Sequence, residues 1–423
     1  MQPWFIPMFY VSGAVLGGLA LPRIEQAYFP GFAVALSVSS AQALLSAAAS
    51  GMMSLTAIVF AMAFVMVQFS AIAYSPRLVL WFARDRMMFH ALGAFTATFV
   101  YALFTLAWVD RGGSAKVPLF STLLVGIMIV ISMLMFARLM QRLGDLQIGN
   151  VLHLVGDQGR DVIRDMFRRL DDQAAVTSAP GGAAGDARLG PATQTVKYFG
   201  KPRTIARFDV RSLVALAQQA GGTIAMACAV GDTLVEGAVL LRVHGAGTPL
   251  PEDTLRGPVR LGRERTFEQD PKYPIRLLVD IAIKALSPAI NDPTTAVQTI
   301  DQLEDLLRRL GAAELDAGYA ADETGALRLV FPTPTWEDYL TLAFDEIRQF
   351  GSSSVQVLRR MRSALVGLTD SLPSEDRAEA VRRYLEHLDH VIEDSPFDAE
   401  DQRMARKEDP QGIGLSRRRV DTA

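Results

Sequence analysis

The feature that most constrains this fold is a long stretch without charge. Residues 26–76 contain no Asp, Glu, Lys or Arg, and Glu25 and Arg77 bound the stretch. A helix rises about 1.5 Å per residue and a bilayer core is about 30 Å thick, so the stretch exceeds one membrane span. It predicts a membrane domain, with a hairpin or interfacial piece at residues 29–45 and a span at residues 51–73.

Three further apolar runs have about the length of a membrane span. They cover residues 4–21, 90–109 and 118–136. None of the four predicted spans contains a charged residue, which argues against proton relays, voltage sensors and charge-coupled transport. No convincing cleavage site follows the first run, so we interpret it as an anchor helix and not as a removed signal.

Arginines at the ends of the spans predict the orientation. Arg77, Arg84 and Arg86 cluster in one loop, and Arg138 and Arg142 follow the fourth span. Positive residues favour the cytoplasmic side. The pattern therefore predicts a multi-pass protein of the bacterial inner membrane, with both termini in the cytoplasm.

Composition separates the two halves of the chain. Hydrophobic residues make up 50% of the sequence, and charged residues are scarce in the first third. The net charge of −3 and the isoelectric point near 6.0 give no sign of a nucleic-acid partner. Cys228 is the single cysteine, which excludes an intrachain disulfide and a cysteine-based metal cluster.

The predicted fold class is an α-helical membrane domain of four transmembrane helices, followed by an α+β, mostly helical cytoplasmic domain. Residues 1–143 form the membrane domain. Residues 144–192 form a connecting helix and a flexible linker, because residues 174–192 are rich in Ala, Gly and Pro. Residues 193–394 form the cytoplasmic domain, and the charged residues 395–423 predict a disordered tail.

A hairpin is predicted within the cytoplasmic domain, from strands at residues 223–229 and 238–243. It resembles the hairpins of biotinyl and lipoyl carrier domains, but the segment lacks the carrier lysine. We therefore expect no covalently attached cofactor. His387 and His390 lie three residues apart among acidic residues, a pattern that a charged outer helix face explains better than a metal site.

The most informative soluble stretch is residues 278–301. An apolar helix ends at Ser287-Pro288, because proline lacks an amide donor and restricts the residue before it. Asp292 can cap the next helix, with Pro293 in its first position. The joint at residues 287–295 has two interpretations. It is a well-capped corner between helices, or a polar pocket that binds a ligand or another subunit.

Three motifs resemble one known family. They are SPRLVLWFARD at residues 75–85, ERTFEQDP at residues 264–271 and ALSPAINDPTTA at residues 285–296. Together they resemble a bacterial family of predicted membrane proteins, domain of unknown function 2254, and the resemblance covers nearly the whole chain. It implies a membrane domain followed by a cytoplasmic domain. It implies no reaction.

The candidate site residues come from these motifs. The ligand-binding candidates are Arg265, Gln269, Asp270, Asp280, Asn291, Asp292 and Thr295. The membrane-loop motif contributes Ser75, Pro76, Arg77 and Asp85. For the first group, the alternative is an ordered loop held by an Arg265–Asp270 contact.

The functional hypothesis is a non-enzymatic, homo-oligomeric module of the lipid bilayer with a regulatory or ligand-sensing cytoplasmic domain. An unknown small ligand or protein would be its partner. A channel-like pore for a small solute or ion is one alternative. A membrane-bound enzyme is another, but the sequence shows no complete set of convergent catalytic groups.

Overall fold

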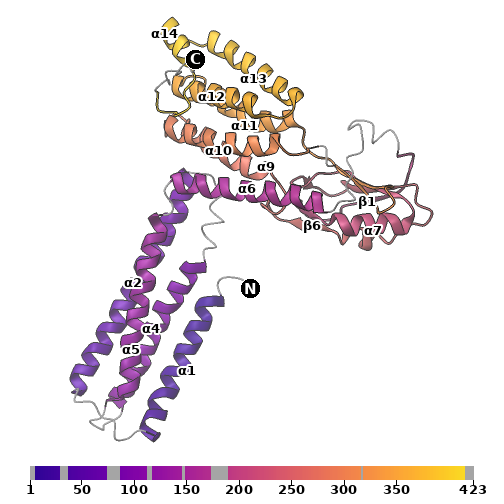
Figure 1. Cartoon of the computed structure of the whole chain (residues 1–423). Coiled ribbons are helices and arrows are strands. Elements are labelled where there is room, and N and C mark those ends of the chain that lie inside the picture. The colour runs from indigo at the N-terminus through magenta and orange to yellow at the C-terminus, as the bar shows by residue number, and fades with distance from the viewer. Residues whose placement is uncertain are drawn as a thin grey trace. The chain divides into compact units, whose positions relative to one another are not determined.

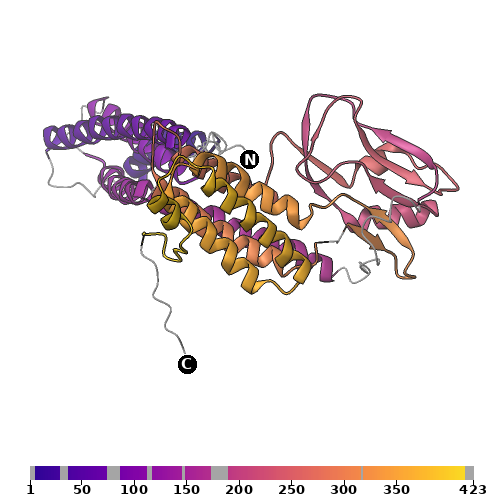
Figure 2. The ribbon, with the colours of Figure 1, turned by 90° about the horizontal axis from the view of Figure 1, so that it is seen from above.

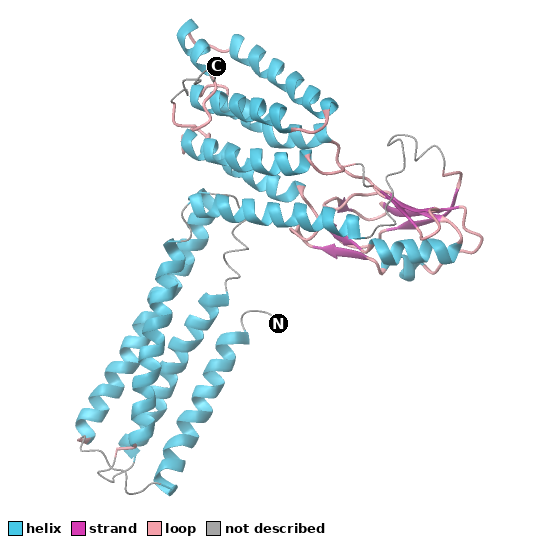
Figure 3. Cartoon of the chain, in the orientation of Figure 1, coloured by secondary structure: helices cyan, strands magenta, loops and turns pink. Residues whose placement is uncertain are grey.

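The computed structural model describes residues 5–28, 37–73, 86–111, 117–144, 148–172, 189–315 and 318–414. The chain divides into two compact units, Met1–Gln147 and Ile148–Ala423. The described part of the first unit is almost entirely helical, and the second unit combines helices with strands (Figures 1 and 3).

The first unit contains four long apolar helices. They are α1 (Phe5–Tyr28), α2 (Val38–Ala73), α4 (Arg86–Arg111) and α5 (Leu119–Gly144). Each is long and apolar enough to cross a membrane. Helix α4 packs against the other three, and 50% of its apolar window is buried, against 17–22% in α1, α2 and α5. The outer helices therefore keep most of their apolar surface exposed, as a lipid-facing helix does.

Helix α2 begins earlier than the sequence predicted. The expected hairpin or interfacial piece at residues 29–45 is wrong for residues 38–45, which are the first turns of α2. Residues 29–36 lie outside the described residues. The helix starts at this point because the Ser37 hydroxyl accepts a hydrogen bond from the Ser40 amide, 3.1 Å away.

Helix α1 continues beyond the predicted span of residues 4–21. It extends past Pro22 to Tyr28 and so includes Arg23 and Glu25, which follow that span in the sequence. Glu25 is buried. Its carboxylate accepts hydrogen bonds from the amides of Phe120 (2.9 Å) and Ser121 (3.2 Å), so it caps the start of α5.

The second unit has nine helices in its described residues. They are α6 (Ile148–Asp172), α7 (Val210–Ala220), α8 (Glu252–Arg256), α9 (Lys272–Ala285), α10 (Pro293–Gly311), α11 (Trp336–Gly351), α12 (Val355–Ser371), α13 (Glu375–Glu393) and α14 (Ala399–Ala405). Within this unit, the strands lie toward one end and α9–α14 toward the other (Figures 2 and 3).

The strands form two sheets. They are β1 (Ala192–Lys197), β2 (Arg203–Phe208), β3 (Thr223–Met226), β4 (Thr233–Leu234), β5 (Val239–His244), β6 (Val259–Gly262), β7 (Tyr319–Ala321) and β8 (Leu327–Val330). One sheet has the order β1-β5-β3-β8-β7 and the other β4-β2-β6. The predicted hairpin is present as the antiparallel pair β3–β5, whereas β3 and β8 pair in parallel, with Ile224 opposite Leu329.

Local capping defines the ends of two helices of this unit. Asp209 accepts from the Ser212 amide at the start of α7, and Gly221, at φ +66°, ends that helix. Thr335 and Asp338 form a reciprocal capping box at the start of α11.

Two predictions about irregular segments meet different outcomes. The tail predicted to be disordered from residue 395 instead contains α14, and the chain is described as far as residue 414. It is ordered because Ala405 and Asp409 are fully buried. Of the predicted linker, residues 174–188 lie outside the described residues, and Ala192 already begins β1.

Candidate pocket around Asp270

A cavity of about 90 Å³ lies in the second unit, lined by residues of β2, α6, α9 and α11 and by the loops beside them. It contains two of the predicted site residues, Gln269 and Asp270. The volume is several times what a single water molecule needs. The pocket can therefore hold a small molecule.

Asp270 is the buried acid of this pocket, with a side chain only 1% exposed. Its Oδ1 accepts a hydrogen bond from the Lys272 amide at 3.2 Å. Its Oδ2 lies 3.5 Å from Nε of Arg265 and receives no hydrogen bond from any described residue. Burial raises the pKa of Asp270, and the charges of Arg265 and Lys272 only partly oppose this.

The turn of the β3–β5 hairpin covers the Arg265–Asp270 contact. Nε of Arg265 donates to the carbonyl of Gly231 at 2.9 Å. Gly231 has φ +90°, and a Cβ at this position would lie 2.4 Å from Oδ2 of Asp270. Only glycine fits here, because both the backbone conformation and the close approach exclude a side chain.

Gln269 and Tyr339 complete the immediate surroundings of Asp270. Oε1 of Gln269 accepts from the Phe208 amide at 2.9 Å, which ties the loop before α9 to the end of β2. Tyr339 of α11 lines the cavity and is 1% exposed. Burial, together with the negative charge of Asp270, raises the pKa of the Tyr339 phenol, so it stays protonated and can donate a hydrogen bond.

The helix corner lies apart from this pocket. Asp292 accepts from the amide and hydroxyl of Thr295, at 3.1 and 2.6 Å, and so caps α10. Asn291 has φ +50°, in the left-handed region that Asn tolerates. Asp270 precedes α9 and Asn291 follows it, so the 14-residue helix separates them by about 20 Å at 1.5 Å per residue.

Asp280 belongs to neither place. It lies in the middle of α9 and forms an ion pair with Arg276 at 2.6 Å. Arg276 also donates to both carboxylate oxygens of Glu346, at 2.5 and 2.8 Å. This network joins α9 to α11.

The structure brings together two groups of the seven ligand-binding candidates. Arg265, Gln269 and Asp270 form one group, and Asn291, Asp292 and Thr295 form the other.

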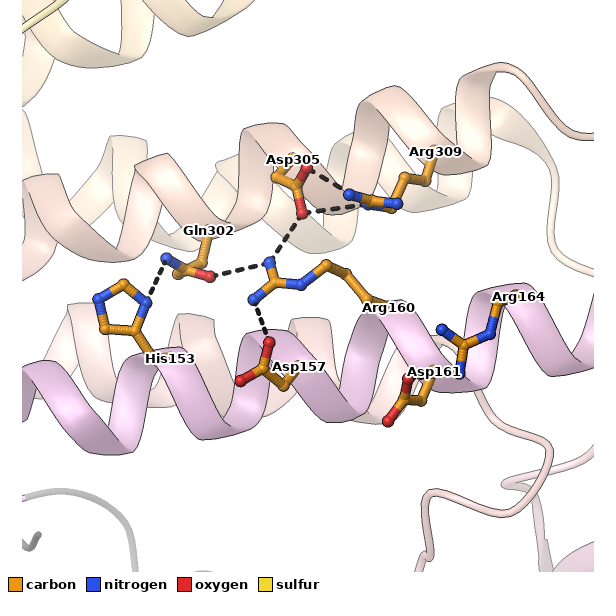
Figure 4. Close-up of polar contacts among 8 residues, drawn as sticks. All are labelled: His153, Asp157, Arg160, Asp161, Arg164, Gln302, Asp305 and Arg309. Atoms are coloured by element: carbon orange, nitrogen blue, oxygen red, sulfur yellow. Dashed lines mark hydrogen bonds and ion pairs between the residues drawn. The ribbon is translucent and has the colours of Figure 1, made fainter.

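Helix α6 packs closely on α10 (Figure 4). Nη1 of Arg160 donates to Asp305 at 2.8 Å and to Gln302 at 3.3 Å, and Nη2 donates to Asp157 at 2.7 Å. A Cβ on Gly156 would lie 2.2 Å from Oε1 of Gln302, so the two helices approach through glycine. Further along α6, Met166 lines the pocket.

The remaining predicted sites are not part of this geometry. The membrane-loop residues Ser75, Pro76, Arg77 and Asp85 lie outside the described residues. In the part of the chain that the structure describes, no group of three or more His, Cys, Asp or Glu side chains is placed to hold a metal ion.

Sequence reasoning missed most of the pocket lining, including the polar residues Arg207, Lys272 and Tyr339. Lys272 directly follows the motif ERTFEQDP, which is the available signal for it. Arg207 lies on β2, which the sequence analysis did not predict, and Tyr339 lies one turn into α11. Neither position carries a local mark of a site.

Four apolar helices followed by a mixed unit define the class: a predicted membrane protein with an appended, mostly helical region that also contains two sheets. The chain belongs to the family described as Predicted membrane protein (DUF2254), whose model matches residues 2–366. It is similar to uncharacterized proteins of Mycobacterium bovis and Mycobacterium tuberculosis, at 27% identity over 401 residues, 90% of this chain and 74% of each relative. No solved structure matches the chain.

Proposed function

We propose that this protein is a non-enzymatic, homo-oligomeric module of the inner membrane whose cytoplasmic unit senses a small ligand. In this proposal the ligand occupies the pocket around Asp270, and helix α6 transmits the effect of ligand binding to the membrane helices. Both chain termini lie in the cytoplasm. The loop arginines Arg84 and Arg86 support this orientation under the positive-inside rule.

One observation carries the proposal: Met166 of α6 lines the pocket. Helix α6 begins at Ile148, and α5, the last apolar helix, ends at Gly144. Only residues 145–147 connect them. A ligand that packs against Met166 therefore contacts the helix that follows directly from the membrane unit.

The packing of α6 on α10, within the second unit, supports a rigid transmitter. Close contact through Gly156 and Gly159, together with the Arg160 hydrogen bonds, holds α6 against α10. A helix fixed in this way moves together with the rest of the second unit and does not bend independently of it. A shift of the pocket walls then becomes a shift of the start of α6.

The pocket lining supports binding and not catalysis. The residues that line it include no Ser, Cys or His, so a Ser–His or Cys–His pair is absent from the described lining. The pore alternative has less support, because the buried hydroxyls of Thr98 and Thr105 donate to their own helix backbone, to Ala94 and Tyr101.

Two experiments test the proposal on the full chain. Reporter fusions after Arg86 and after Arg142 should both report cytoplasm, and a periplasmic signal at either position contradicts the orientation.

Hydrogen–deuterium exchange in nanodiscs tests the coupling between the pocket and the membrane helices. Asp270→Asn should change exchange in α4 and α5, and two glycines inserted after Gly144 should remove that change. Identical exchange in wild type and Asp270→Asn would refute transmission.

A further inference from the structure

Two cations line the pocket without an ion pair at contact distance among the described residues. Arg207, at the end of β2, and Lys272, at the start of α9, both line the cavity and are half-buried. Within the described ranges, neither side chain forms an ion pair or a hydrogen bond. Desolvating a cation without a partner is unfavourable, so such groups favour a bound anion.

The acids of the same pocket are already engaged. Glu268 pairs with Arg260 at 3.1 Å. Asp209 accepts from the amide and hydroxyl of Ser212 at the start of α7. The third acid, Asp270, contacts Arg265. The Ser212 groups are neutral, so Asp209 keeps its charge. Four cations, Arg207, Lys272, Arg260 and Arg265, therefore face three acids, which leaves one positive charge in excess at the cavity.

Helix geometry adds to this positive field. Helices α7 and α9 begin at Val210 and Lys272, which line the cavity, and α11 begins two residues after Pro334, which also lines it. A helix N-terminus carries a partial positive charge of about half an elementary charge. The carboxylates of Asp209 and Asp338 already cap α7 and α11, so the start of α9, whose N-cap residue Pro271 has no side-chain cap, contributes most to a field that favours a negative group.

Asp270 adds a second requirement. Its Oδ2 is buried and receives no hydrogen bond from the residues that the structure describes. A buried acceptor without a donor is costly. A ligand that carries a hydroxyl or amine beside its acidic group would supply the missing donor.

We propose that the pocket binds a small hydroxylated or amino-substituted organic anion. Its acidic group lies between Arg207 and Lys272, and its hydroxyl or amine donates to Oδ2 of Asp270. The acidic group is a carboxylate or a phosphate. This inference rests on the proposed function, because it names the ligand class of the same pocket.

Isothermal titration calorimetry on the full chain in nanodiscs tests the site with two matched pairs of probes. Malate differs from succinate by one hydroxyl, and glycerol 3-phosphate differs from inorganic phosphate by its hydroxylated carbon chain. The hydroxylated member of at least one pair should bind about tenfold more tightly than its partner, because it alone satisfies Asp270. The pair that responds identifies the acidic group. Failure of all four probes to bind at 10 mM overturns the proposal.

Variants locate the binding. Arg207→Gln and Lys272→Gln should each weaken the responding probe about tenfold or more, as loss of a charged contact does. Arg263→Gln is the matched control, because Arg263 is exposed and does not line the cavity. Its affinity should equal that of wild type. Asp270→Asn should reduce the preference for the hydroxylated probe.

Each contrary result has a defined meaning. Unchanged affinity in both Arg207→Gln and Lys272→Gln overturns the anion site, and an undiminished preference in Asp270→Asn overturns the role of Asp270. Either single variant suffices if the other does not fold. A probe that binds without altering exchange in α4 and α5 refutes the proposed coupling but leaves the site intact. If no probe binds, the site fails, while the exchange comparison of wild type with Asp270→Asn still tests the coupling.

Discussion

A Cβ placed on Gly159 of α6 would lie 2.8 Å from Cδ1 of Leu306 on α10, so the two helices touch where one of them has no side chain. Cβ of Pro274, on α9, would lie 3.2 Å from the same position. The contact therefore fixes α6 against both helices that flank the predicted corner. It is also the contact on which transmission through α6 depends.

We predict that Gly159→Val destabilises the second unit. The added side chain overpacks this contact, at a cost of about 1–3 kcal/mol. Thermal unfolding of the full chain in detergent should show a lower melting temperature. Gly149→Ala is the matched control on the same helix, because a Cβ there meets nothing within 4 Å. It should gain up to about 1 kcal/mol from the better helix propensity of alanine, and a loss as large as that of Gly159→Val would contradict the packing argument.

The helix corner should separate backbone conformation from capping. Asn291 has φ +50°, so Asn291→Ala should cost about 1–2 kcal/mol, whereas Asn291→Gly should cost much less. Asp292→Ala should cost about 1 kcal/mol through loss of the cap, and Asp292→Asn should be mild. Thermal unfolding measures all four variants. If Asp292→Asn were as damaging as Asp292→Ala, the carboxylate charge would matter beyond capping.

The sequence predicted this corner because its determinants are local. Pro288 ends one helix, and Asp292-Pro293 begins the next without help from distant residues. The strand order of the sheet was harder to predict from the sequence, because the parallel pairing of Ile224 with Leu329 joins residues about a hundred positions apart. Strand β2 was missed altogether, since its short run RTIARF lies between a bend and the start of α7 and depends on β4 and β6 for its hydrogen bonds.

The candidate site was predictable only in part for the same reason. The motif ERTFEQDP supplied Arg265, Gln269 and Asp270, which the structure does bring together. Met166 and Arg207 reach the same cavity from α6 and β2 through tertiary packing. No spacing in the sequence encodes that approach. The ordered tail was missed because its charged composition hides one buried acid, Asp409.

That acid gives a further prediction. Asp409 accepts from the amides of Gly412 at 2.9 Å and Gly414 at 2.6 Å. Hydrogen bonds to a buried charge contribute about 1.5–3 kcal/mol each, so Asp409→Ala should cost about 2–4 kcal/mol after partial relaxation. Glu408→Ala removes the neighbouring acid, which is less buried, and should change the melting temperature little. Equal melting temperatures for the two variants would show that the tail contributes nothing to stability.

The last prediction concerns the pH dependence that Asp270 creates. Burial raises the pKa of its carboxyl above the ordinary value of 3.8, while Arg265 and Lys272 oppose the shift and Asp232 adds to it. Well below pH 3.8 the carboxyl is protonated in both the folded and the unfolded chain, and its contribution to stability is complete. As the pH rises through the raised pKa, the folded state must hold a buried charge and this contribution to stability is lost.

The variant Asp270→Asn tests this pH dependence, because its side chain stays neutral and keeps an oxygen that can accept from the Lys272 amide. The melting temperature of Asp270→Asn should therefore rise relative to wild type between pH 4.5 and pH 8, in buffers without organic anions. Tyr339→Phe is the control, because it alters the same pocket but leaves the carboxyl in place, so its difference from wild type should stay constant over this range. If the Asp270→Asn difference stayed flat or fell with pH, the favourable charges of Arg265 and Lys272 would outweigh burial at this carboxyl.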